Sequence, residues 1–257
     1  AAAVGLQVLG WRPFASTFAA FLTRAYDFIR MAAVSRARVC ISGSHAGVSI
    51  GEDGPSQMGL EDIAAFRAVH GSVVLHPCDG NQTAKLVAAM ADVDGIAYLR
   101  TLRPATEVRY GPDEQFEIGG SRVLRSSDED DVAIVAAGIT VREALTAAER
   151  LAEDGISARV IDLYSLKPVD VEALAVAAEA TRGRIVTVED HWPEGGLGDA
   201  VLAALADSEE AARVVKLAVQ RMPSSGKPEE LLAAAGIDAE HVAAAARRLV
   251  AQTVQTA

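Results

Sequence analysis

The sequence is poor in cysteine and in positive charge. Its two cysteines, Cys40 and Cys78, lie in apolar surroundings without metal-site spacing. They predict buried, reduced thiols of a cytoplasmic protein rather than a disulfide framework. Lysine and arginine number 24 against 35 aspartates and glutamates, which gives a formal net charge of -11. This balance argues against a nucleic-acid-binding surface, because such a surface needs cations that neutralise phosphates.

Long apolar runs are also missing. No run approaches the ~18 residues of a membrane span, so no membrane partner is expected. The apolar start, residues 1–9, lacks a basic leading segment and is therefore unlike a signal peptide. The chain has no initiator methionine, which indicates either processing or a fragment.

Short β-branched runs alternate with longer helical patterns along the chain. This alternation predicts an α/β fold with two three-layer domains, each built on a parallel sheet covered on both faces. The irregular residues 104–121 are expected to form a linker, so the predicted domains are 1–118 and 119–257. Strands are predicted at 39–42, 73–76, 96–101, 132–137, 158–162, 184–189 and 214–219. Helices are predicted at 17–33, 57–69, 81–90, 141–152, 171–180, 197–205 and 239–251.

The loop at residues 43–57 carries the densest set of reactive side chains. It contains a histidine, two carboxylates, several hydroxyls and an amide among glycines, which permit tight turns and close approach by a ligand. Ligands bind at the carboxyl ends of strands in α/β domains, and this loop follows a predicted strand. A purely structural loop with capping side chains fits these residue types equally well.

Six short motifs lie in the order and at the spacing of the transketolase family. They are Ser16-Thr17-Phe18, Ser49-Ile50-Gly51-Glu52-Asp53-Gly54-Pro55-Ser56-Gln57, Pro77-Cys78-Asp79-Gly80, Arg100-Thr101-Leu102-Arg103-Pro104, Val188-Glu189-Asp190-His191 and Ser225-Gly226-Lys227-Pro228-Glu229. The chain therefore resembles transketolase over nearly its whole length. The animal-type branch is nearer, because Ser56-Gln57 stands where the microbial branch has Thr-His.

The resemblance implies an incomplete pyrimidine-binding domain followed by the family's C-terminal domain. It also implies a thiamine diphosphate enzyme that moves a two-carbon ketol unit from a ketose phosphate to an aldose. The family's diphosphate-binding domain is missing, so a partner domain or subunit is expected to bind the diphosphate with magnesium or calcium. A homodimer or a heterotetramer with that partner is the expected assembly.

The resemblance also assigns residues that bind the cofactor. Phe18 and Phe21 resemble the aromatics that hold the aminopyrimidine ring, because flat side chains on one helix face suit a flat heterocycle. Arg24 would support that pocket, and a solvated helix arginine fits its position equally well. The family's catalytic glutamate would fall immediately before Ala1, so no catalytic residue and no metal ligand is assigned in this chain. Glu52 is expected to be structural.

Four further residues resemble the family's substrate contacts. His45 and Arg103 resemble the pair that grips the sugar phosphate, since arginine offers a fork of donors and histidine a donor near neutral pH. Asp53 resembles the carboxylate that accepts from a donor-ketose hydroxyl. Gln57 can both donate to and accept from sugar hydroxyls.

Other polar residues are expected to be structural. His76 and His191 are predicted to be hydrogen-bonded histidines of the interior. Residues 195–198, with three glycines before a helix, are a weak anion-site candidate, and tight packing at a domain contact is the favoured interpretation. Lys227 does not belong to a phosphate loop, because the spacing of the first glycine is wrong and Pro228 follows.

Two other functions remain open from the sequence. One is a beta-type subunit of another thiamine diphosphate enzyme, such as a 2-oxo acid dehydrogenase or deoxyxylulose-phosphate synthase. The loop from His45 to Gln57 argues against this alternative. The other is a non-catalytic subunit that completes a partner's site, and the presence of His45, Asp53, Gln57 and Arg103 favours a substrate-handling role instead.

Overall fold

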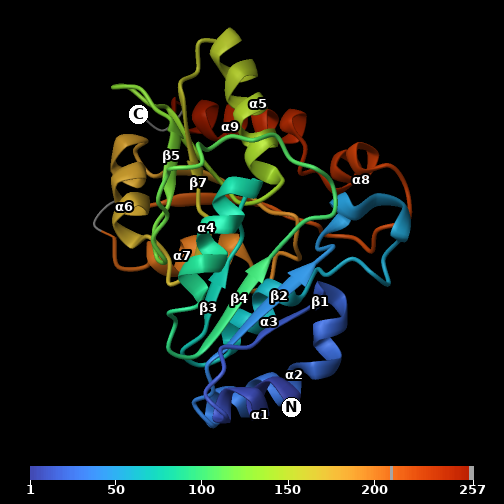
Figure 1. The fold of residues 1–257 in the computed structure, drawn as a ribbon. Helices are drawn as coiled ribbons and strands as arrows, with labels where there is room; N and C mark the ends of the chain where they lie inside the picture. Colours follow the sequence, from blue (N-terminus) through green and yellow to red (C-terminus); the bar gives the residue numbers. More distant parts are fainter. Residues whose placement is uncertain (209–210, 255–257) are drawn as a thin grey trace.

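Two five-stranded sheets flanked by helices make up the computed structural model, which describes residues 1–208 and 211–254 (Figure 1). The first sheet has the order β1-β2-β4-β3-β8 and the second the order β10-β9-β6-β7-β5. The strands are β1 (Phe14–Phe18), β2 (Val39–Ser44), β3 (Val73–Leu75), β4 (Ile96–Arg100), β5 (Arg122–Arg125), β6 (Val132–Ala136), β7 (Ala158–Asp162), β8 (Ser165–Lys167), β9 (Arg184–Val188) and β10 (Arg213–Leu217). The α-helices are α1 (Ala2–Val8), α2 (Tyr26–Val34), α3 (Asp62–Ala68), α4 (Gly80–Met90), α5 (Thr140–Glu153), α6 (Val171–Ala180), α7 (Leu197–Ala204), α8 (Pro228–Ala235) and α9 (Ala239–Val254). The 3₁₀ segments η1 (Ala19–Ala25) and η2 (Val48–Asp53) follow β1 and β2.

The predicted α/β class is confirmed, although both sheets are mixed rather than wholly parallel. Strand β8 pairs antiparallel with β3, and β5 pairs antiparallel with β7, while the other pairings are parallel. The predicted domains, residues 1–118 and 119–257, are called the first and second halves below. Strand β8 comes from the second half of the chain but completes the first sheet. The two halves are therefore joined by shared backbone hydrogen bonds as well as by side-chain packing.

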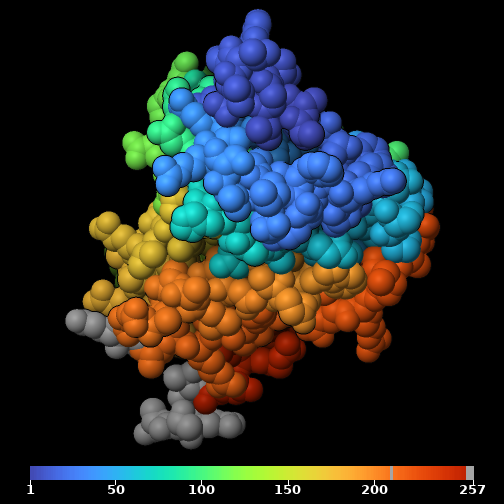
Figure 2. Space-filling view, turned by 90° about the horizontal axis from the view of Figure 1, so that it is seen from below, coloured from blue at the N-terminus to red at the C-terminus, as the bar shows by residue number. Residues whose placement is uncertain are grey.

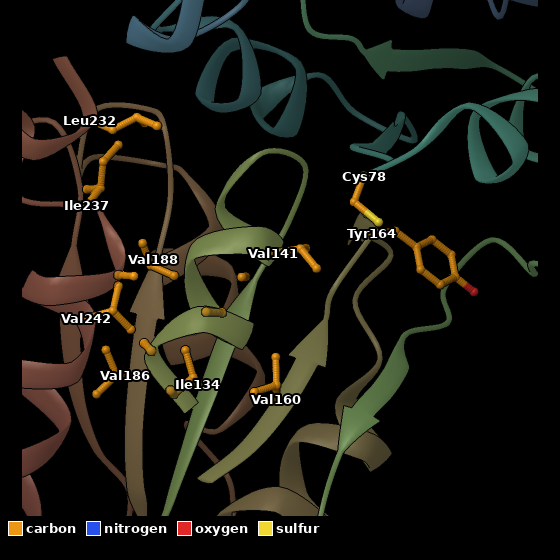
Figure 3. Close-up of a cluster of buried hydrophobic side chains, with 14 of the residues drawn as sticks. Cys78, Ile134, Val141, Val160, Tyr164, Val186, Val188, Leu232, Ile237 and Val242 are labelled. Atoms are coloured by element: carbon orange, nitrogen blue, oxygen red, sulfur yellow. The ribbon is translucent and has the colours of Figure 1, made fainter. Parts of the chain in front are cut away.

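Two hydrophobic clusters cover opposite faces of the sheets. Successive side chains of a strand point to opposite faces, so Ile134 of β6 belongs to one cluster and Val135 to the other. The first cluster packs under α4, α5 and α9, and Figure 3 shows its part around Ile134, Val160 and Val186. The second packs under α2, α3, α6 and α7. Both clusters take residues from both halves, so the core continues across the junction.

The predicted helix at 17–33 is wrong in its first half. Residues 14–18 form β1, which pairs parallel with β2 from Phe14–Cys40 to Phe18–Ser44, and a 3₁₀ segment separates it from α2. Pairing with a distant strand overrides a local apolar period that resembles a helix. The predicted helix at 57–69 likewise begins only at Asp62, because the Gly59 carbonyl oxygen accepts from the Gly47 N–H and from Arg100.

The predicted linker, residues 104–121, contains no helix or strand in the structure but is not a free tether. Tyr110 and Phe116 are buried, and their rings pack edge-on with centroids 4.8 Å apart. Phe116 also packs against Tyr164. The segment therefore follows the junction of the two halves as part of the core. Within the described residues, no helix is both long and apolar enough to cross a bilayer.

Candidate functional site

The predicted binding residues gather at the carboxyl edge of the first sheet. Strands β1, β2 and β4 are parallel neighbours and end at Phe18, Ser44 and Arg100. His45 follows β2 directly, and Arg103 follows β4 at the same edge. This is the edge at which open α/β sheets bind ligands.

Three aromatic rings stack at the ends of β1 and β2. The β1–β2 register pairs Phe18 with Ser44, so the ring of Phe18 lies beside that of the next residue, His45. Their centroids are 3.9 Å apart and their planes are inclined by 14°. Phe21 stacks on Phe18 at 5.4 Å and 7°, and it is 51% exposed. An exposed ring in such a stack offers a surface on which a flat heterocycle can pack.

Phe18 and Phe21 stack on each other, but the predicted shared helix face is wrong. Phe18 ends a strand and Phe21 lies in η1, so they do not share the face of one helix. The change of direction between strand and 3₁₀ segment is what brings the rings together. Arg24 is exposed in the last turn of η1, and no contact in the described chain joins it to the ring stack.

Arg103 binds the loop that carries the other predicted substrate residues. Its Nη1 donates to the Ile50 carbonyl oxygen at 3.0 Å and lies 3.3 Å from Asp53 Oδ2 and 3.7 Å from Glu52 Oε2. The Glu52 side chain is 72% exposed, so this long contact leaves its predicted structural role a prediction. The predicted phosphate-binding arginine faces the predicted hydroxyl acceptor, whereas no described contact joins Arg103 to His45.

Glycines give the loop after β2 its shape. Gly47, Gly51 and Gly54 have φ values of +86°, +82° and +80°, which side chains rarely tolerate. His45 also has a left-handed backbone, with φ of +56°. Gln57 is half-buried, and its N–H donates to the Gly54 carbonyl oxygen at 3.1 Å. The loop is therefore folded back on itself, with Asp53 and Gln57 on consecutive turns.

A buried charged network lies beneath this edge. Arg100 is fully buried, and its Nε donates to Asp62 Oδ2 at 2.9 Å. Burial alone would raise the pKa of Asp62, but Arg100 holds it below its usual range. Arg100 Nη1 lies 3.2 Å from His76 Nε2. The network fixes the end of β4 and hence the start of the segment that carries Arg103.

The expectation for the two interior histidines is confirmed. His76 is 2% exposed and His191 is fully buried. Burial, reinforced by nearby Arg100, lowers the pKa of His76 to about 3 and that of His191 to about 4. His191 Nδ1 lies 2.7 Å from the Trp192 carbonyl oxygen. Both are neutral structural side chains near neutral pH.

The glycines at 195–198 pack a contact between the halves, as favoured from the sequence. Arg67 of α3 donates to the carbonyl oxygens of Gly195 and Gly196 at 2.6 and 2.8 Å. The N-terminus of α7 already holds a carboxylate, because Glu189 accepts from the N–H groups of Leu197 and Gly198 at 2.5 and 3.0 Å. The weak anion-site interpretation is therefore wrong. Lys227 only precedes α8, as its N-cap.

Asp190 and Arg100 also shape the site, although neither was predicted from the sequence to do so. Asp190 follows β9, and its carboxylate accepts from the N–H groups of Val48 and Ser49 at 2.7 and 3.0 Å. Both residues belong to the motifs that carried the family resemblance. No local pattern indicated that one contacts the loop and that the other joins the two halves.

The described residues fit only the ring part of the implied cofactor. The stack of Phe21, Phe18 and His45 presents flat apolar surface to an aminopyrimidine. A diphosphate with a divalent ion needs oxygen ligands and an anion cradle. Across residues 1–208 and 211–254, no group of three or more His, Cys, Asp or Glu could hold a metal ion.

Comparison with known families gives two matches along the chain. The family described as "Transketolase, pyrimidine binding domain" matches residues 1–108, and "Transketolase, C-terminal domain" matches residues 121–242. The chain is similar to the transketolases of Mus musculus and Homo sapiens, with 50% identity over 238 residues to each. Those residues are 93% of this chain but 38% of each relative, so the chain spans about two fifths of their length.

Among solved structures, the chain is similar to a "Split gene transketolase, inactive beta4 tetramer". The TM-score is 0.87 with 38% identity, and the match covers 97% of this chain and 79% of that one. The structural similarity therefore extends over both sheets and over the junction between the two halves.

Proposed function

The chain belongs to the transketolase family, and from that premise we propose that it handles the cofactor ring and the sugar in a thiamine diphosphate-dependent ketol transfer. A two-carbon unit would move from a ketose phosphate to an aldose. The observation that carries the proposal is the meeting of an exposed aromatic stack with the loop bearing Asp53 and Gln57, at the carboxyl edge of one sheet. A flat ring and a polyhydroxy phosphate are the ligands that this combination suits.

In this proposal a partner completes the cofactor site. Phe18 and Phe21 hold the aminopyrimidine ring, and Arg24, which no described contact joins to their stack, supports the pocket when the ring is bound. A diphosphate-binding domain or subunit holds the diphosphate with magnesium or calcium. When bound, thiamine diphosphate supplies the carbanion-stabilising chemistry of the transfer. This chain's residues position the ring and keep the sugar at the sheet edge.

Arg103 and His45 bind the sugar phosphate in this proposal, and Asp53 and Gln57 bind the sugar hydroxyls. The hydrogen bond that Arg103 makes within the described residues uses Nη1, so Nη2 and Nε remain as donors for a phosphate. Its ion pairs with Glu52 and Asp53 are partly exposed and therefore weak. A doubly charged phosphate can compete for this guanidinium while Asp53 turns to a hydroxyl.

The N-terminal segments offer a surface for subunit association. More than half of the large apolar side chains that the described chain exposes lie in residues 1–34. They are Leu6, Val8, Leu9, Trp11, Phe14, Phe21, Phe28, Met31 and Val34. Figure 2 shows these segments, in blue, gathered at one end of the molecule. An apolar surface of this kind marks an interaction site, and we assign it to a homodimer or heterotetramer that includes the diphosphate-binding partner.

The cell compartment we propose is the cytoplasm. Cys40 and Cys78 are both buried free thiols, which suits a reducing environment.

Reconstitution tests the function. The chain would be co-purified with the product of a neighbouring reading frame that carries the diphosphate-binding domain, and ketol transfer from a ketose phosphate would be followed with thiamine diphosphate and magnesium. Activity is expected from the complex and not from this chain alone. A stable complex that binds the cofactor but transfers no ketol unit would contradict the proposal.

A further inference from the structure

The loop between β2 and α3 is held by the second half of the chain. Its 3₁₀ segment η2 begins after Gly47, and no side chain of the segment itself caps it. The cap comes from Asp190, whose two carboxylate oxygens each accept one N–H, from Val48 and from Ser49. The two ends of this contact are 142 and 141 positions apart in the sequence.

The loop packs tightly against the Asp190 carboxylate at Gly47. A Cβ at Gly47 would overlap that carboxylate, so only glycine allows the loop to approach so closely. Asp190 is 1% exposed, and its carbonyl oxygen accepts from Arg100 Nη2 at 2.8 Å. Its position is thus set by the buried network of the first half.

Two further contacts from the C-terminal half support the other end of the loop. A Cβ at Gly51 would lie 3.1 Å from Pro228 Cδ, at the start of α8. One at Gly54 would lie 2.6 Å from Ser225 Oγ. Figure 1 shows α8 beside this loop, next to the end of β2. The segment with Asp53 therefore rests on α8 and the residues before it.

We propose that Asp190 is a positioning residue that sets the loop for substrate binding, and that the C-terminal half thereby shapes a site to which the first half supplies the contacts. The contact between Asp190 and the loop is independent of the proposed function, whereas its effect on substrate binding rests on that function. The carboxylate holds the start of η2, and the peptide chain from Val48 to Asp53 transmits that position to the predicted hydroxyl acceptor. Loss of the cap frees the loop while the sheet beneath it stays intact.

Glu189 provides a matched control. It precedes Asp190, is 2% exposed and also accepts from two successive N–H groups. Those groups belong to Leu197 and Gly198 of α7, within the second half. The two adjacent carboxyl groups thus accept from the same kind of donor, but only Asp190 contacts the loop.

The test is amide hydrogen exchange in the full chain, read by mass spectrometry for Asp190→Asn and Glu189→Gln. A bond to a charged group corresponds to about a ten- to hundredfold change in an opening equilibrium. Exchange at residues 48–54 should quicken by about that factor in Asp190→Asn, while residues 197–200 stay unchanged. Glu189→Gln should show the reverse pattern. Unchanged loop exchange in Asp190→Asn, or equal changes in both variants, would overturn the proposal.

A second variant covers the case in which Asp190→Asn does not fold. Gly47→Ala keeps the carboxylate and its neighbours but pushes the loop away from it, so the same residues should exchange faster. If the amides of residues 48–54 exchange no faster in Gly47→Ala, the proposal that Asp190 positions the loop would be contradicted.

Kinetics in the reconstituted complex distinguish positioning from general stability. Asp190→Asn should raise KM for the ketose phosphate by about tenfold and leave kcat much less affected, whereas Glu189→Gln should alter neither. If no complex transfers ketol units, the proposed function fails, and the exchange experiment still decides whether Asp190 holds the loop.

Discussion

Arg100→Met should destabilise the chain strongly, because Arg100 joins both halves through buried polar contacts. Its Nε pairs with Asp62, whose side chain is 1% exposed, and its Nη2 donates to the carbonyl oxygens of Gly59 and Asp190, both at 2.8 Å. Removing one partner of a buried ion pair costs about 3–5 kcal/mol. Two carbonyl oxygens would lose a donor as well, at about 1 kcal/mol or more each. We therefore expect a loss of about 5 kcal/mol, a large part of an ordinary domain's stability.

Urea unfolding at a fixed protein concentration measures this loss, and the double variant Asp62→Asn/Arg100→Met identifies its cause. Much of the cost is the orphaned Asp62 charge, so the double variant should be more stable than Arg100→Met alone. In Arg100→Met the pKa of Asp62 should rise, because burial raises it and the arginine that held it down is gone. The folded state would then take up a proton that the unfolded state lacks, so the deficit should shrink as the pH falls. A loss below about 1 kcal/mol, or strictly additive single effects, would refute the reasoning.

Further predictions concern the substrate, the cofactor and pH. In the reconstituted enzyme, Arg103→Ala should raise KM for phosphorylated sugars about ten- to a hundredfold and hardly affect unphosphorylated ones; equal impairment of both would make Arg103 a structural residue. Asp53→Ala should impair both kinds of donor and weaken discrimination between hydroxyl configurations, as steady-state kinetics on paired donors would show. Calorimetry on the chain alone should detect no tight magnesium-dependent binding of thiamine diphosphate, since the described residues hold no cluster for the ion. Burial raises the pKa of Asp162 to about 6, so its contribution to folding stability is complete only below its unfolded pKa of about 4 and is lost as the pH rises through 6. The free energy of unfolding of Asp162→Asn should therefore rise relative to the wild type by about 2 kcal/mol between pH 4 and 7 in denaturant titrations. A difference that does not vary with pH would argue against a buried, titrating Asp162.

The sequence alone was enough for the fold class and for the family. Buried parallel strands appear as short β-branched runs, and the strands predicted at 132–137, 158–162 and 184–189 match β6, β7 and β9 closely. The structural roles of His76 and His191 were also predictable, whereas Phe18 and Phe21 stack without the shared helix face that was predicted for them. Each of these expectations depends on residues within one segment or on the order of the motifs.

Only the tertiary structure decided how the site is held. It turned residues 14–18 into a strand by pairing them with β2, and it added β8 from the second half to the first sheet. It also placed Arg103 against Asp53 and the Asp190 carboxylate on the Val48 N–H. A local pattern reflects the interactions of a residue with its near neighbours in the chain. These contacts join residues dozens to more than a hundred positions apart, and they form because two sheets that share one core bring strand ends and loops together.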